Sequence, residues 1–404
     1  MKKDLNQLGQ QVRQSAEALE ADVVSFLRDL VAIPSPSCEE AKVVARIREE
    51  MEKVGFDEVF VDKMGNVIGR IGRGEKVILY DSHVDTVGVG DPDAWECDPF
   101  KGELEGGVVY GRGASDNKGA TASQVYGAKL LKDLGLTGDF TLYVIGTVQE
   151  EDFDGLAIQY AVEHSLPRRP DVVVLGECTD LDVYRGQRGR VELQVRTRGV
   201  ACHGSAPERG VNAIYKMLPL IQGIAELNNH LKEDPFLGKG TVVVSKIECQ
   251  TPSINAVPDN CTIYIDRRLT VGETIETALE EIRSLEGFGD AEIIVPKYSK
   301  PSHTGLVVEQ EVYCPTWVLE EEHPLVQAGA RAAQAIRGEE PKISHWIFST
   351  NGVATMGRLG IPTIGFGPSR EPFAHSVQDQ CPVEHLTQSV AFYATFPQAL
   401  MNEA

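Results

Sequence analysis

The sequence contains no run of apolar residues long enough to cross a membrane. A membrane-spanning helix needs about 18 or more consecutive apolar residues, and no segment of the 404-residue chain approaches that length. Residues 1–24 also lack the apolar core that a secretory signal carries. We therefore expect no membrane partner and a cytoplasmic protein.

Positive charge is scarce. Lys and Arg together number 39 against 60 Asp and Glu, so the formal net charge is −21. Such an excess of negative charge disfavours nucleic acid and anionic membranes as partners. Most of the acidic residues are expected on solvated surface, so the net charge does not indicate a cationic substrate.

Paired cysteines are also missing. The eight cysteines are scattered through a long chain and none forms a CxxC pair. This spacing is typical of free thiols in a reducing compartment. Cys178 and Cys202 flank candidate site residues, but neither has a sequence partner that would activate it as a nucleophile, and free Cys often packs as a small apolar residue.

The stretch from Asp81 to Gly119 is the most informative part of the chain. Residues 76–80 form a short apolar run typical of a buried strand, and His83 and Asp85 follow it in alternation. Ligands collect at the carboxyl ends of strands in α/β sheets. We predict that His83 binds a metal and that Asp85 orients its ring. The alternative is a solvated loop.

The second half of this stretch reads GRGASDNKG, with Asp116 among three glycines and just ahead of a helical pattern over 117–134. Glycine permits close backbone approach and unusual dihedral angles. A carboxylate on such a loop can bridge two cations through its two oxygens. The alternative is that Asp116 only caps the following helix.

Further carboxylates follow two other apolar segments. Glu150 and Glu151 come after a predicted strand at 139–148, and Glu177 comes after one at 171–176. The carboxyl ends of such strands meet at one edge of a sheet. Two adjacent carboxylates point in different directions, so one can bind metal while the other acts as a base. The alternative for the pair is an acidic turn.

The motifs SHVDTV, GRGASDNKG, Glu150-Glu151, GECTD and AHSVQDQ, in this order, resemble the M20 family of dinuclear zinc hydrolases. The resemblance runs from about residue 20 to the end, and within the family the sequence resembles the YgeY-type hydrolases, a group linked to selenium metabolism. It implies two Zn²⁺ per chain, with Mn²⁺ or Co²⁺ possible. It further implies that Glu150 is the general base and that Asp116 bridges the two ions. One ion would be bound by His83 and Glu177, and the other by Glu151 and His375.

We predict an α/β fold with a catalytic domain in two parts, residues 1–181 and 301–404. Its sheet is expected to be mixed, mostly parallel and flanked by helices. Residues 182–300 read as an inserted α+β unit of order βαββαβ. This unit resembles the family's lid domain, which implies a homodimer formed through the lid.

The resemblance also assigns substrate contacts. His203, in CHGSAPERGVNAI, matches the lid histidine that polarises the scissile carbonyl, often from the partner subunit. Asn255 and Arg268 match positions that contact a substrate carboxylate, a task that suits the donor fork of Arg. A further loop reads Thr350-Asn351-Gly352, where the family usually has a Gly-rich loop that often carries an Asp and binds the substrate.

These features predict a hydrolase that cleaves an amide-type C–N bond of a small N-acyl or dipeptide-like substrate, using a metal-activated water. A ureido or carbamoyl amidohydrolase is the alternative. The 33-residue spacing from His83 to Asp116, and Glu177 in place of a His, argue against that branch. A third possibility is a binding protein without turnover, but it would be expected to have lost ligands, and none is missing from the motifs.

Overall fold

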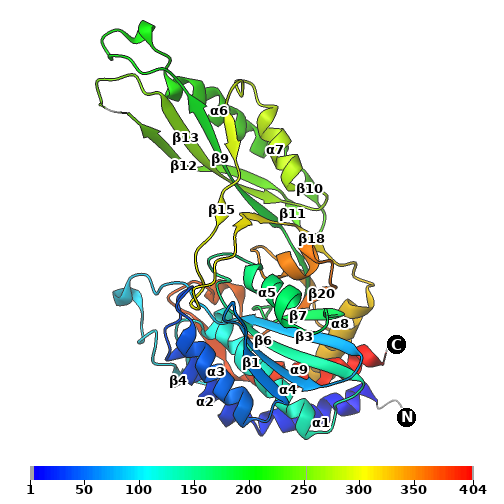
Figure 1. Ribbon diagram of the computed structural model, residues 1–404. Coiled ribbons are helices and arrows are strands. Elements are labelled where there is room, and N and C mark those ends of the chain that lie inside the picture. The colour runs from blue at the N-terminus through cyan, green and yellow to red at the C-terminus, as the bar shows by residue number, and fades with distance from the viewer. Residues whose placement is uncertain (1–3, 252, 403–404) are drawn as a thin grey trace.

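The computed structural model describes residues 4–251 and 253–402. It has a large α/β body, in which both ends of the described chain lie, and an arm that projects from it (Figure 1). The arm corresponds to the middle of the sequence, so the chain leaves the body once and returns to it.

The body is built on a nine-stranded sheet. Its strands are, along the sheet, β1 (Glu58–Val61), β2 (Val67–Gly72), β6 (Phe140–Thr147), β3 (Lys76–His83), β7 (Val172–Leu175), β20 (Thr363–Gly365), β8 (Val183–Gln187) and β18 (Trp317–Val318), with β19 (Ile343–Trp346) also paired to β8.

The sheet is mixed, as predicted, but it is not mostly parallel. Of the eight pairings between described strands, four are parallel and four antiparallel. The parallel pairs include the central strands β6, β3, β7 and β20. The antiparallel pairs lie toward the edges, where short connections such as the one from β1 to β2 allow only a hairpin.

Apolar side chains cover both faces of the central strands, which explains why these strands read as continuous apolar runs. In β3, Ile78 and Tyr80 pack into one core while Val77 and Leu79 pack into another on the opposite face. All eight residues of β6 are buried. The larger core includes helices α1 (Leu5–Glu17), α2 (Glu20–Val31), α3 (Ala41–Lys53), α4 (Gly119–Asp133), α8 (Pro324–Arg337) and α9 (Val383–Met401). The other core includes α5 (Leu156–Tyr160).

Two helical features differ from the sequence expectation. Apolar residues recur at near-helical spacing from 4 to 31, which predicts one helical segment, but these residues form two helices, α1 and α2, which meet at Ala18 and Leu19. Helix α9 was not predicted. It packs against α1, α4 and α8 and is buried on most of its surface, so its apolar residues do not form the single stripe that identifies a surface helix.

The arm has the predicted βαββαβ order. Its elements are β9 (Gly189–Arg198), α6 (Ala213–His230), β12 (Thr241–Gln250), β13 (Asn260–Leu269), α7 (Ile275–Arg283) and β14 (Glu292–Ile294). The antiparallel sheet runs β12-β13-β9-β14, with one face packed on α6 and α7. Apolar and polar residues alternate from Gln187 to Arg198 in the sequence, which predicts a strand. The residues of β9 alternate accordingly between buried and half-exposed along most of the strand.

The chain passes from the body to the arm through a single residue, Arg188, between β8 and β9. It returns through paired short strands, β15 (Lys297–Tyr298) with β16 (Gln310–Glu311), and through β17 (Tyr313–Cys314), which pairs with β9. Sheet membership therefore places the crossings near 188 and 315, whereas the sequence placed them near 182 and 300. Strand β8 was assigned to the arm because it continues almost directly into β9.

A small three-stranded sheet joins two distant parts of the chain. Strand β5 (Val108–Tyr110) pairs with β4 (Glu103–Glu105) and with β21 (Gln380–Pro382). These pairings bring the segment before Asp116 close to the segment after His375. The two loops that carry these residues are thus anchored to each other by backbone hydrogen bonds.

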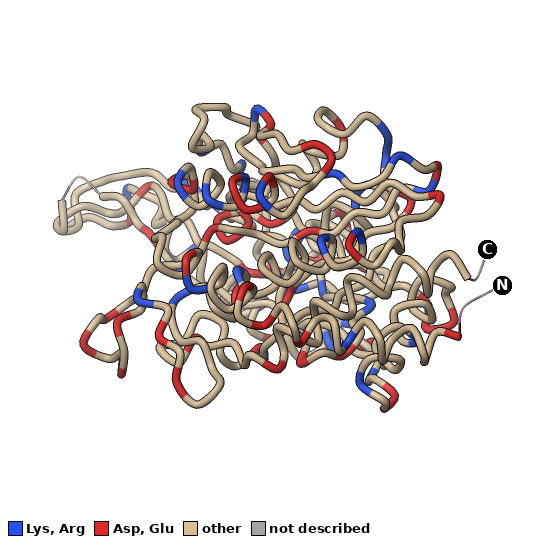
Figure 2. Tube along the Cα trace, turned by 90° about the horizontal axis from the view of Figure 1, so that it is seen from below, with Lys and Arg blue, Asp and Glu red and all other residues tan. Residues whose placement is uncertain are grey.

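Acidic and basic residues are interspersed along the described chain, with acidic positions in the majority (Figure 2). Within the described residues, no helix combines the length and the apolar character that crossing a membrane requires.

Candidate metal centre

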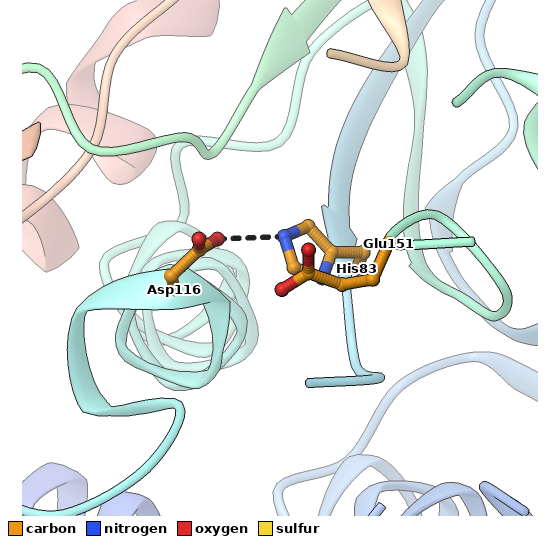
Figure 3. Close-up of side chains that lie close together, drawn as sticks. All are labelled: His83, Asp116 and Glu151. Atoms are coloured by element: carbon orange, nitrogen blue, oxygen red, sulfur yellow. Dashed lines mark hydrogen bonds and ion pairs between the residues drawn. The ribbon is translucent and has the colours of Figure 1, made fainter. Parts of the chain in front are cut away.

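The centre of the site is a contact between His83, at the end of β3, and Asp116, on the loop before α4. The His83 Nε2 atom lies 2.8 Å from Asp116 Oδ1 (Figure 3). His83 is buried and Asp116 nearly so. The Asp116–Asn117 peptide bond is cis. The structure thus brings together the first two residues that the sequence assigned to a metal.

Asp116 uses its other oxygen toward the second histidine. His375 Nε2 lies 3.1 Å from Asp116 Oδ2 and 2.9 Å from Glu151 Oε2. Asp116 therefore lies between the two histidines, with one oxygen directed at each. This is the geometry that a bridging carboxylate requires.

The remaining two carboxylates lie on the His83 side. His83 Nε2 is 3.7 Å from Glu177 Oε1 and 3.9 Å from Glu150 Oε2. Ligand atoms of His83, Glu150 and Glu177 all lie within 4.8 Å of one another, and so do those of His83, Asp116 and Glu151. All six predicted residues of the centre thus converge on one place.

Strand register explains this convergence. Strand β3 is parallel to both β6 and β7, with His83 opposite Thr147 and Asp81 opposite Leu175. The three strands therefore end at the same edge, and Glu150, Glu151 and Glu177 follow within four residues. The carboxyl edge of the parallel strands is where ligands bind in such sheets.

Asp85 positions the residues of the site through hydrogen bonds. Its buried carboxylate accepts the backbone N–H groups of Glu150 and Glu151, both at 3.1 Å, and the Ser37 hydroxyl at 2.6 Å. Its backbone carbonyl lies 3.0 Å from His83 Nδ1, whereas its carboxylate is 3.6 Å away. Asp85 thus contacts the His83 ring mainly through its carbonyl, and its carboxylate positions the two glutamates.

The protonation of the cluster reflects crowded negative charge. Burial raises the pKa of Glu150 well above its usual value, that of Glu151 to about 7 and that of Glu177 to about 8, and neighbouring carboxylates add to each shift. Hydrogen bonds to Asp116 and Glu151 raise the pKa of His375 to about 10. A buried group of four carboxylates is costly unless cations compensate it.

The donor set fits two divalent cations. Two imidazole nitrogens and the three carboxylates of Asp116, Glu151 and Glu177 match the ligands that Zn²⁺ prefers. Two such ions carry four positive charges, which offset these three carboxylates and that of the neighbouring Glu150. Asp116, with one oxygen toward each histidine, can serve both ions at once.

Asp379 braces the loop that carries Asp116. Its buried carboxylate accepts hydrogen bonds from Gly113 N–H at 2.7 Å, from Ser115 N–H and Oγ at 2.8 and 2.7 Å, and from Arg112 Nη1 at 3.1 Å. Asp379 was not among the residues predicted from the sequence. Its position four residues after His375, in the same polar motif, is the signal that was available.

A cavity of about 800 Å³ opens over the cluster. One wall is the centre itself, and another is the root of the arm, which contributes Arg188, Arg190 and Arg268. The returning segment adds Tyr298 and Lys300. The cavity therefore lies where the body and the arm meet, and it is large enough for a small-molecule substrate.

The structure corrects the predicted substrate loop. The Thr350 hydroxyl donates to Gln187, and Asn351 bonds to Asp81, Thr147 and Gly155. These side chains are buried, so they support the sheet instead of facing the cavity. Gly352 lies against the Trp317 ring. The preceding residues 347–349 line the cavity in their place.

The three predicted contacts on the arm have different positions. Arg268 lines the cavity, whereas His203 and Asn255 are exposed and do not. These two are neighbours, because Gly204 N–H donates to the Asn255 carbonyl at 2.6 Å. Strand β9 runs ten residues outward before this region, which is about 30 Å at roughly 3.3 Å per residue. Strand β9 leads away from the body (Figure 1), so His203 and Asn255 lie far from the centre of their own chain.

Comparisons with known proteins match nearly the whole chain. The family model described as peptidase family M20/M25/M40 matches residues 79–399. The uncharacterized protein YgeY of Escherichia coli is 52% identical over 96% of both chains. An N-formyl-4-amino-5-aminomethyl-2-methylpyrimidine deformylase of Halalkalibacterium halodurans is 25% identical over 93% of both. The solved structure of a dinuclear metal binding peptidase of Bacillus subtilis superposes with a TM-score of 0.69, at 17% identity, covering 96% of this chain and 99% of that one.

Proposed function

The chain belongs to peptidase family M20/M25/M40, and we propose on this basis that it is a dinuclear zinc enzyme that cleaves small N-acyl or dipeptide-like compounds. It is a hydrolase of a metal-dependent family that acts on amide bonds of small substrates. The observation that carries the finer proposal is the position of Asp116 between His83 and His375, with one oxygen toward each.

In this proposal His83 and Glu177 would hold one ion, Glu151 and His375 would hold the other, and Asp116 would contribute to both sites. Mn²⁺ or Co²⁺ can replace Zn²⁺ with such ligands. When bound, the ions supply a water of lowered pKa and stabilise negative charge on the substrate oxygen. Asp85 supports this work by fixing the backbone of Glu150 and Glu151.

Glu150 is the proposed general base. Its carboxylate is buried at the cavity and reaches to 3.9 Å from His83 Nε2. Burial raises its pKa, which makes it a stronger base. It takes a proton from the attacking water and delivers it to the leaving nitrogen, so that amide and water become acid and amine.

We further propose a homodimer in which His203 of one chain serves the centre of the other. His203 lies too far out to reach its own centre. The arm also carries seven of the twelve large apolar side chains that are exposed among the described residues, which are Val200, Val211, Tyr215, Leu218, Val243, Ile247 and Ile254. A concentration of exposed apolar side chains on one unit favours a protein–protein contact there. In the dimer, His203 would stabilise the oxyanion.

Cytoplasmic localisation stays a prediction from the cysteine pattern.

Metal analysis and one substitution test the catalytic proposal. We expect two zinc ions per chain after reconstitution, measured by mass spectrometry. Glu150→Gln should retain both ions and lose turnover by about 10²- to 10⁴-fold, the usual contribution of a general base. Glu163→Gln, an exposed glutamate on the body, is the matched control. Fewer than two ions would contradict the dinuclear centre, and retained turnover would remove Glu150 as the base.

A further inference from the structure

We propose that Tyr298 is a positioning residue for the catalytic step, because it holds in place the short segment that carries Glu150 and Glu151. The proposal rests on the hydrolase function proposed above, in which Glu150 is the general base. It gives a role to residues 297–303, the return segment, which begins with β15 where the chain comes back from the arm to the body (Figure 1).

The chain that carries the two glutamates begins in an unfavourable backbone conformation. Gln149 has a φ of +58°, in the left-handed region that residues other than glycine rarely adopt. Such a conformation persists only where the surroundings impose it. The Gln149 N–H donates to Glu40 Oε1 at 2.9 Å, and its carbonyl accepts from the Phe153 N–H at 3.0 Å. The turn over residues 149–153 is therefore closed by contacts at both of its ends.

The side chain of Gln149 is held largely by the return segment. It is fully buried. Its Nε2 lies 2.9 Å from the Tyr298 hydroxyl, 3.1 Å from Cys38 Sγ and 3.5 Å from the Pro301 carbonyl. Two of these three acceptors belong to the return segment. Because Gln149 directly precedes the proposed base, fixing its side chain also fixes the backbone from which that base extends.

Tyr298 contacts the far end of the same turn as well. Its hydroxyl donates to Asp152 Oδ2 at 3.2 Å, and its ring stacks on that of Phe153, with centroids 5.2 Å apart and an angle of 12° between the planes. Lys300 donates to the same oxygen of Asp152 at 2.7 Å. A single side chain of the return segment thus binds the turn on either side of the two glutamates.

The position of this turn matters for the chemistry. A general base must lie within hydrogen-bond reach of the proton that it takes, and a displacement of about 1 Å can cost about 10²-fold in rate. Asp85 fixes the N–H groups of Glu150 and Glu151, and Tyr298 fixes the residues on both sides of them. Tyr298 also lines the cavity, so the test must separate positioning from direct contact with the substrate.

Hydrogen exchange tests the positioning role without a substrate. Tyr298→Phe removes the hydroxyl and its hydrogen bonds but keeps the ring that stacks on Phe153. In the zinc-reconstituted protein, we expect the backbone amides of residues 150–153 to exchange about five-fold or more faster than in the wild type, because the turn opens more often. Tyr126→Phe is the matched control. It removes a buried hydroxyl that donates to Glu50 at 2.6 Å, and it should leave these amides unchanged.

Turnover tests whether Tyr298 acts through Glu150. The assay uses whichever compound of a panel of N-acetyl amino acids and dipeptides the wild-type protein hydrolyses fastest. Tyr298→Phe should lower kcat by about 10- to 100-fold, as loss of a supporting residue typically does, and change KM by less than about two-fold, with both zinc ions retained. In the Glu150→Gln background it should cost less than about two-fold more, because the position of an absent base has no effect.

The proposal is overturned if Tyr298→Phe leaves the exchange of residues 150–153 unchanged, or if Tyr126→Phe speeds it equally. It is also overturned if the losses from Tyr298→Phe and Glu150→Gln multiply, since the hydroxyl would then act on the substrate independently of the base. Failure of the hydrolase proposal is seen separately, as fewer than two zinc ions or as full turnover in Glu150→Gln. The exchange result decides the positioning role even where no compound of the panel is hydrolysed.

Discussion

Replacing Asp379 by Asn tests how the loop that carries Asp116 is held in place. The two oxygens of Asp379 accept four hydrogen bonds from Arg112, Gly113 and Ser115, and the side chain is almost fully buried. The Asn side chain has one acceptor oxygen, and its NH₂ group, a hydrogen-bond donor, takes the place of the second carboxylate oxygen. Two of the four bonds are lost, and two donors then face the new amide.

The expected loss of stability follows from these contacts. Arg112 is only 3% exposed, and Asp379 is its only ion-pair partner among the described residues. Removing one partner of a buried pair costs about 3–5 kcal/mol. The Arg112 guanidinium also lies 5.0 Å from the Trp95 ring centroid, a contact that remains. We therefore expect Asp379→Asn to lower the free energy of unfolding by about 3 kcal/mol, near the lower end of this range.

The same substitution should weaken metal binding, because Asp116 follows Ser115 directly. Loss of a residue that positions a ligand typically lowers metal affinity by about 10- to 100-fold. Urea unfolding of the metal-free protein gives the stability, and competition with a chromophoric chelator gives the zinc affinity. The stability loss must appear in the metal-free form, since the hydrogen bonds do not depend on the ions.

Glu50→Gln is the matched control. Glu50 is equally buried and is bound by Arg46, Lys53 and Tyr126, on α3 and α4. It should destabilise the protein without changing zinc affinity. The reasoning is refuted if Asp379→Asn leaves both quantities unchanged, or if the two variants lower zinc affinity equally, because the effect would then be a general consequence of instability.

Three further predictions follow from other contacts. Burial raises the pKa of Glu50, but hydrogen bonds from Tyr126, Lys53 and Arg46 outweigh it and leave the pKa lowered. The wild-type protein should therefore lose stability as the pH falls below about 4.5, the ordinary Glu value. Urea unfolding measured over a range of acidic pH should show a smaller loss of unfolding free energy for Glu50→Gln. Equal losses in the two proteins would contradict this prediction. Asn351→Ala, which removes three buried hydrogen bonds, should lower the free energy of unfolding by about 3 kcal/mol, and a change below about 1 kcal/mol would show that the loop relaxes. His203→Ala and Glu150→Gln should each be nearly inactive alone, yet a mixture refolded together should regain activity in mixed dimers; a mixture as inactive as its parts would place both residues in one chain's site.

The sequence could identify the residues that cluster at the sheet edge because strand ends are local features. Each apolar run marks a buried strand, and the polar residue after it must lie at the sheet edge, so His83, Glu150, Glu151 and Glu177 were found one by one. Their convergence needed only the parallel order of β6, β3 and β7. Pairings at the sheet edges were less predictable, since short strands such as β18 and β19 leave no clear pattern in the sequence.

The lining of the cavity was harder to predict, because a side chain's partner decides its role. The sequence predicts that Arg268 is free to bind a substrate, but its guanidinium is already hydrogen-bonded to Asp266. The sequence predicts Asn351 to be a polar loop residue, but its side-chain amide donates hydrogen bonds to Asp81 and Thr147. Only the three-dimensional arrangement shows which polar groups are already satisfied.

The two-part body has a consequence for the order of folding. Strands and helices of the arm pair within about one hundred consecutive residues, so the arm can form as soon as that segment leaves the ribosome. The body cannot, because α1 packs against α8 and α9, and His375 joins a cluster that begins with His83. Its completion depends on contacts of very large sequence separation, which are slow to form. The reactive site is thus the last part to mature, after the surface proposed for dimerisation is already in place.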